Sequence, residues 1–155
     1  MLLLYKDGFE YRLGAVLGDL LGQHCAFQFV LENIAIDIVT WIPPTAHALR
    51  RRGYDHAGVL AHGVARHLGV EAQQYLVRKR MRDLRTLSRE QRWAEVQGSF
   101  AWKELAPEAE QSLSGRHVLI VDDVLTTGAT LEGAAQMFQG LGAAKVTGAV
   151  LARAW

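Results

Sequence analysis

The apolar residues of this chain form two kinds of pattern that alternate along the sequence. One is the spacing typical of helices, and the other is the short run typical of buried strands. Apolar residues recur at i, i+3 and i+4 between Arg12 and about Ala26, which predicts an amphipathic helix packed on a core. The same spacing over Ala57–Leu68 predicts a second helix, and Gly69 is placed to end it. A third helix is expected from Thr130 onward. Its apolar face comprises Leu131, Ala134, Ala135, Phe138 and Leu141.

Mainly apolar runs separate these helices. Val118–Val121 is short and continuously apolar, which is typical of a strand buried on both faces of a parallel sheet. Ile36–Ile42 and Val146–Leu151 are the other two predicted strands. Gln74–Val77 is a weaker strand candidate. Ser88, with Gln91 three residues later, predicts a capping box at the start of a short helix. The alternation predicts an α/β fold, with a parallel sheet and helices on both of its faces.

Length, charge and cysteine content limit the possible classes of protein. The 155 residues are half apolar and show no repeat or linker, so a single domain over residues 1–155 is expected. The net charge of +1 gives no global field for nucleic acid, although arginines gather at 50–52 and 78–92. Cys25 is the only cysteine, which excludes an internal disulfide and a cysteine zinc site. No membrane span or signal sequence is recognised, so the cytoplasm is the expected location.

The segment Val118–Thr130, VLIVDDVLTTGAT, combines a buried strand with acidic and small residues. Asp122 and Asp123 are expected at the carboxyl end of the strand, the edge at which open α/β sheets bind ligands. The small residues Thr126, Thr127, Gly128, Ala129 and Thr130 then lead into a helix. Backbone N–H groups at such a turn can bind an anion, and carboxylates suit sugar hydroxyls or hydrated Mg²⁺.

This segment resembles the signature of the type I phosphoribosyltransferases, which have a Rossmann-like fold and bind 5-phosphoribosyl-1-diphosphate. Two further segments, WIPPTAHALRRRGYDHAGVLA from Trp41 to Ala61 and LSREQRWAEVQGSF from Leu87 to Phe100, are similar to ComF-type proteins within that group. Many ComF-like proteins carry a four-cysteine zinc ribbon ahead of this domain, which the chain lacks. Asp55 and His56 stand where those proteins usually have Asn-Gln.

The resemblance implies a role for each part of the predicted site. Asp122 and Asp123 would be catalytic, binding the ribose hydroxyls and holding Mg²⁺, either directly or through water. The loop residues Thr126, Thr127, Gly128, Ala129 and Thr130 would bind the 5-phosphate. The diphosphate would be bound by Pro43, Pro44 and Thr45, together with Arg50 and Arg52. Thr126 replaces an aspartate of the 6-oxopurine transferases, which argues against hypoxanthine or guanine as the acceptor.

Two functions stay open at this point. One is a Mg²⁺-dependent phosphoribosyltransferase with an unidentified acceptor. The other is a non-catalytic, ComF-like accessory protein of DNA uptake in natural transformation, which binds single-stranded DNA. The basic segment 78–92 would be a mobile lid, a DNA surface or a plain solvated surface, and a homodimer is also left open. Tyr54 is expected to be a packing aromatic. His56 is expected to be a surface or helix-start residue, while its position beside the predicted site keeps the role of an acid or base open.

Overall fold

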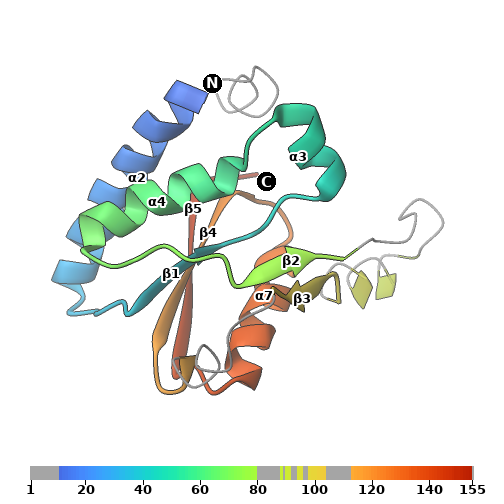
Figure 1. The fold of residues 1–155 in the computed structure, drawn as a ribbon. Coiled ribbons are helices and arrows are strands. Elements are labelled where there is room, and N and C mark those ends of the chain that lie inside the picture. Colours follow the sequence, from blue (N-terminus) through green and yellow to red (C-terminus); the bar gives the residue numbers. More distant parts are fainter. Residues whose placement is uncertain are drawn as a thin grey trace.

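A three-stranded parallel sheet forms the centre of the molecule. The computed structural model describes residues 11–79, 88, 90–91, 94–95, 98–103 and 113–154. The strands are β1 (Ile38–Trp41), β4 (His117–Leu125) and β5 (Lys145–Arg153), in the order β1-β4-β5 (Figure 1). These strands confirm the three apolar runs predicted from the sequence, with somewhat different ends.

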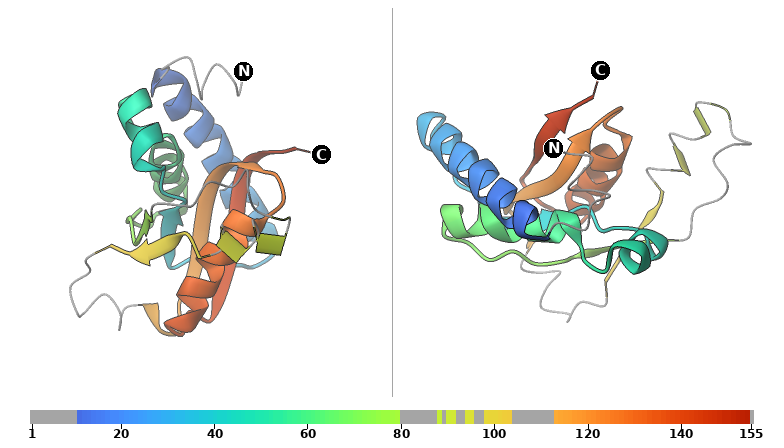
Figure 2. Two further views of the ribbon diagram at one scale, coloured as in Figure 1. Left: turned by 90° about the vertical axis from the view of Figure 1, so that its right-hand side faces the viewer. Right: turned by 90° about the horizontal axis from the view of Figure 1, so that it is seen from above.

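Helices cover both faces of this sheet, as predicted. Helices α2 (Tyr11–Leu31) and α4 (His56–Leu68) pack on one face, and α7 (Ala129–Gly140) packs on the other (Figures 1 and 2). Side chains of a strand alternate between the two faces, and β4 does so here. Leu119 and Val121 pack with α2 and α4, and Val118 and Ile120 pack with α7. Both faces of β4 are thus buried, which explains its continuous apolar sequence.

Helices α2 and α4 approach each other at glycines. A Cβ atom built on Gly63 of α4 would lie 2.5 Å from the carbonyl carbon of Gly18 on α2. No side chain fits at that distance, so the close packing of the two backbones requires glycine at position 63. Asp55 caps the start of α4, and Gly69 ends it in the left-handed conformation, with φ 69°, as predicted.

Two of three short elements were not predicted. Helix α3 (Ala46–Arg52) follows the turn after β1, and β2 (Leu76–Arg78) pairs antiparallel with β3 (Phe100–Trp102). Strands of three residues are too short to show a period, and α3 has no buried residue that could produce an apolar stripe. Only β2 overlaps a predicted segment, Gln74–Val77.

The predicted end of the central strand is wrong. Strand β4 continues through both acids to Leu125, because β5 runs on beside it and pairs Asp122 with Val150. On its other side, β1 ends with Trp41 opposite Val121. The acids therefore lie inside β4 but beyond the end of β1. They are at a strand end on the side of β1, as predicted, but not on the side of β5, where the pairing continues.

The first helix is also longer than predicted. Helix α2 continues to Leu31, five residues beyond Ala26. Within the described residues, no helix is both long and apolar enough to cross a membrane.

Candidate active site

A cavity of about 340 Å³ opens where β1 ends and β4 continues. We call it the strand-end cavity. Its walls come from the turn after β1, from α3, from the first residue of α4, from β2, from the end of β4 and from the start of α7. Six segments that are distant in the sequence thus converge at the carboxyl end of the sheet, where ligands of open α/β sheets bind.

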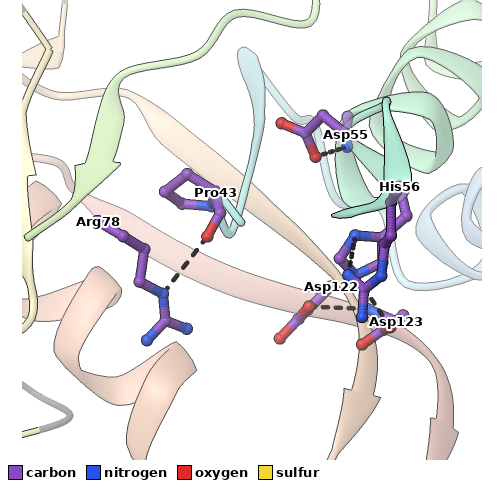
Figure 3. Close-up of polar contacts among 8 residues, drawn as sticks. Pro43, Asp55, His56, Arg78, Asp122 and Asp123 are labelled. Atoms are coloured by element: carbon purple, nitrogen blue, oxygen red, sulfur yellow. Dashed lines mark hydrogen bonds and ion pairs between the residues drawn. The ribbon is translucent and has the colours of Figure 1, made fainter. Parts of the chain in front are cut away.

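Asp122 and Asp123 line this cavity from opposite faces of β4. Asp123 is 3% exposed and shares its face with Leu119 and Val121, so it points toward α4. Asp122 is half-buried and points to the other face, the side of β2. The backbone N–H of Asp123 donates to Oδ1 of Asp122 at 2.9 Å (Figure 3). The alternation of one strand therefore gives the two acids different surroundings.

His56 contacts Asp123 and links it to Arg52. Nε2 of His56 lies 3.0 Å from Oδ2 of Asp123, and Nδ1 lies 3.1 Å from Nη1 of Arg52. A guanidinium only donates, so Nδ1 accepts from Arg52 and the ring proton lies on Nε2, the nitrogen that faces Asp123. The result is a chain of polar contacts, with a hydrogen bond from Arg52 to His56 and a close contact from His56 to Asp123. It fixes the position of a carboxylate that burial would otherwise destabilise.

The expectation for His56 is therefore wrong in one respect. His56 does begin α4, but it is 6% exposed and contacts a buried carboxylate. The preceding residue determines its placement. Asp55 accepts the N–H of Gly58 at 3.0 Å and the indole N–H of Trp41 at 2.7 Å, which ties the start of α4 to the end of β1. A capping aspartate is visible in the sequence, but its bond to Trp41 is not.

Arg78 is a second site residue that sequence reasoning did not single out. Its Nε donates to the carbonyl oxygen of Pro43 at 3.4 Å (Figure 3). Its Nη1 donates to Oγ of Ser99 at 3.2 Å. Its guanidinium carbon lies 4.9 Å from the centroid of the Phe100 ring. Burial lowers the pKa of Arg78, whereas the charge of Asp122 opposes that change. Arg78 is thus a partly buried cation held beside the cavity, not part of a solvated surface.

The predicted phosphate loop lies at the start of α7. Gly128 precedes this helix with φ 83°, a left-handed conformation that glycine adopts readily. Thr126 and Thr130 line the strand-end cavity, whereas Thr127, Gly128 and Ala129 are not among its lining residues. Oγ1 of Thr127 accepts the N–H of Ala129 at 3.4 Å, and Ala129 itself is buried.

The predicted diphosphate residues are only partly brought together. Pro43, Pro44 and Thr45 line the cavity, and so does Arg52. Oγ1 of Thr45 already accepts the N–H of Ala48 as the cap of α3, at 3.1 Å. Arg50 is exposed on α3 and is not a lining residue. The positive wall of the cavity is therefore formed by Arg52 and Arg78.

The acidic side chains also fit a divalent cation. His56, Asp122 and Asp123 each offer one ligand atom within 4.8 Å of the others. Carboxylate oxygens are the donors that Mg²⁺ prefers. His56 is a poor ligand in this arrangement, because Arg52 leaves the proton on the ring nitrogen that faces Asp123. The chemistry of the site therefore favours a cation held by Asp122 and Asp123.

Most of the basic segment 78–92 lies outside the described residues, including 80–87, 89 and 92. Ser88 and Gln91 are described, and they confirm the predicted capping box. The N–H of Ser88 donates to Oε1 of Gln91 at 3.0 Å, and the N–H of Gln91 donates to Oγ of Ser88 at 3.2 Å. Whether the segment is a lid or a DNA surface stays a prediction.

Several solved structures share this fold. A B. subtilis glutamine phosphoribosylpyrophosphate amidotransferase, complexed with ADP and GMP, superposes with a TM-score of 0.60 at 20% identity, over 97% of this chain and 30% of that one. A structure described as the allosteric regulatory enzyme of purine biosynthesis gives 0.58 at 20% identity, with the same coverage. Trypanosoma cruzi hypoxanthine phosphoribosyltransferase gives 0.55 at 12% identity, over 93% of this chain and 75% of that one.

The chain thus spans less than a third of the length of the first two of these proteins. At these identities the likeness establishes the type I phosphoribosyltransferase fold. No curated protein sequence matches the chain. The family described as phosphoribosyl transferase domain matches residues 55–154, a range that includes His56, Arg78, both acids and the loop before α7. The chain therefore belongs to the phosphoribosyl transferase domain family.

Proposed function

We propose that this protein binds 5-phosphoribosyl-1-diphosphate with Mg²⁺ in the strand-end cavity and transfers the phosphoribosyl group to an acceptor still to be identified. One observation carries the proposal. A single cavity is lined by two acids, by two arginines and by the hydroxyls of Thr126 and Thr130. The proposed ligand needs the same three kinds of group, because it has ribose hydroxyls between two anionic ends.

The positions of these groups support one orientation of the ligand. The 5-phosphate would lie at Thr126 and Thr130, where the N-terminal end of α7 also favours an anion. The ribose hydroxyls would then meet the carboxylates of β4. The diphosphate would lie toward Pro43 and Pro44, between the guanidinium groups of Arg52 and Arg78.

The reaction forms a bond from the acceptor to C1 of the ribose and breaks the bond from C1 to the diphosphate oxygen. Positive charge develops on the sugar and negative charge on the leaving group. Asp122, beside the sugar, would stabilise the first, and Arg52 and Arg78 the second, so fixed charges and positioning would supply the catalysis. Mg²⁺, held by the two acids, would neutralise part of the diphosphate charge and orient the ribose hydroxyls.

His56 would act through Asp123 rather than on the ligand. Its close contact with Asp123 would hold that carboxylate at one orientation, and its hydrogen bond with Arg52 would hold the guanidinium at the cavity wall. Both groups are thereby in position before the ligand arrives, which reduces the reorganisation that binding requires.

Thermal unfolding with ligand tests this proposal. A ligand at about one hundred times its dissociation constant adds about 2.7 kcal/mol to the stability of the folded state. For a domain of this size, that corresponds to a rise in melting temperature of about 5–10 °C. We expect this rise with 5-phosphoribosyl-1-diphosphate and Mg²⁺, a smaller rise with ribose 5-phosphate, and the smallest rise when a chelator replaces Mg²⁺.

Two variants test whether the rise in melting temperature depends on the strand-end cavity. Asp122→Asn should lose most of this rise, because Asp122 lines the cavity. Glu132→Gln is the matched control, since Glu132 is an exposed acid on α7 that does not line the cavity. Equal rises in the wild type and Asp122→Asn would remove the acid from the site. No rise at millimolar ligand would contradict the proposal and leave the ComF-like DNA-binding function as the remaining hypothesis. If the ligand does raise the melting temperature, diphosphate release across a panel of bases and amines would test turnover.

A further inference from the structure

Helix α2 has two apolar faces, and only one of them is buried within the described chain. The first packs against α4 through Gly14, Leu17, Gly18, Leu21, Gly22 and Cys25. The second is exposed, although it consists of Val16, Leu20, Phe27 and Leu31, which expose between 55% and 65% of their surface. A helix that is apolar on opposite sides normally has a partner on each side.

The four exposed residues form one stripe along the helix. With 3.6 residues per turn, they fall within an arc of about 60°. The stripe extends along most of α2, which lies at the outer edge of the molecule, on the far side from α7 (Figures 1 and 2). Val30, beside the stripe, is 80% exposed. The surface is therefore continuous and free to meet another molecule.

The spacing of the stripe is symmetric. Its members are separated by four, seven and four residues, so the order is the same when read from either end. A two-fold axis between Gln23 and His24 would place Val16 opposite Leu31 of a second copy, and Leu20 opposite Phe27. Contacts of this kind, in which one patch meets itself, are the usual basis of two-fold dimers.

The charges near the stripe are compatible with such a contact. Gln23 lies at its centre and is neutral. Asp19 lies at its border, but Nη2 of Arg66 on α4 is 2.7 Å from its Oδ1, and His67 is 3.4 Å from the same atom. The charge of Asp19 is thus offset within its own chain, and two copies could approach without strong like-charge repulsion.

The area is also sufficient. The exposed parts of Val16, Leu20, Phe27, Val30 and Leu31 amount to roughly 600 Å² in each copy, or about 1,200 Å² in a pair, at the lower end of specific interfaces. We infer that α2 is a self-association surface, through which two copies of this chain pair antiparallel about an axis near Gln23.

Sedimentation equilibrium over a wide range of protein concentration tests this inference. We expect a reversible dimer in the wild type. Leu20→Glu with Phe27→Glu should raise the dimer dissociation constant at least 100-fold, because each change occurs twice in the interface. Leu49→Glu is the control, since Leu49 is an apolar residue of α3 that is 43% exposed and lies away from the stripe. Circular dichroism would verify that all variants are folded.

Cross-linking tests the orientation. A chain with Val16→Cys, mixed with a chain with Leu31→Cys and treated with a short bismaleimide, should give cross-linked pairs that neither chain gives alone. Cross-linking of Val16→Cys with itself would indicate parallel pairing and overturn the inferred axis. A wild type that stays monomeric, or a dimer that survives Leu20→Glu with Phe27→Glu, would overturn the assignment of α2. If the stripe on α2 instead binds a different protein, the purified wild type would stay monomeric.

Discussion

The close contact between the buried side chains of His56 and Asp123 should contribute strongly to the stability of the fold. The two side chains are only 8% and 4% exposed, and their nitrogen and oxygen atoms are 3.0 Å apart. His56→Ala would leave the carboxylate of Asp123 buried without this donor. Leaving a buried polar group without its partner costs about 1–3 kcal/mol, and more when the group is charged. We therefore expect His56→Ala to lower the free energy of unfolding by about 3 kcal/mol.

Urea unfolding followed by circular dichroism would measure this loss, provided that the slope with urea stays constant. The melting temperature should fall by about 6–12 °C. His62→Ala is the control, because His62 is an exposed histidine of the same helix, and it should cost less than about 1 kcal/mol.

A double-mutant cycle separates the interaction energy between His56 and Asp123 from the contribution of the packing around them. In an Asp123→Asn background, the cost of His56→Ala should shrink by about 1.5–3 kcal/mol, since the buried charge is gone. A total loss below about 1 kcal/mol, or a coupling energy below about 0.5 kcal/mol, would refute the argument that this bond holds Asp123.

Two further predictions concern packing and pH. Gly63→Ala should destabilise the fold by at least about 2 kcal/mol in urea unfolding, because its Cβ would lie 2.5 Å from Gly18. Gly140→Ala, on a helix end with nothing within 4 Å, should instead add up to about 1 kcal/mol, and equal effects would contradict the packing argument. Burial, reinforced by Lys145, lowers the pKa of His117, so protonation is harder in the folded state. Its contribution to stability is therefore complete above about pH 6.5 and is lost as the pH falls through the lowered pKa. In His117→Gln, the free energy of unfolding should fall less steeply over this pH range than in the wild type. If the two curves of unfolding free energy against pH run parallel, His117 is not the group responsible.

Local patterns predicted much of the fold. Three apolar runs became the three strands of the parallel sheet, and the helical stripes became α2, α4 and α7. Gly69 ends α4 and Gly128 takes a positive φ before α7, because both depend on the conformational freedom of glycine. The acids of β4 were predicted as site residues from their place directly after a buried apolar run, and both line the strand-end cavity.

The remaining features depend on contacts between distant segments. Strand β4 runs past both acids because β5 continues beside it, which the sequence of β4 alone cannot reveal. His56 is 67 positions from Asp123, and Arg78 is 35 positions from Pro43, so neither contact leaves a pattern within a short window. The sequence by itself determined the periods of the helices and strands, the glycine positions and the acidic segment, because these follow from local geometry. Only the tertiary structure decided which side chain faces which acid, because sheet register and the alternation of side chains along β4 direct Asp123 to α4 and Asp122 to the side of β2.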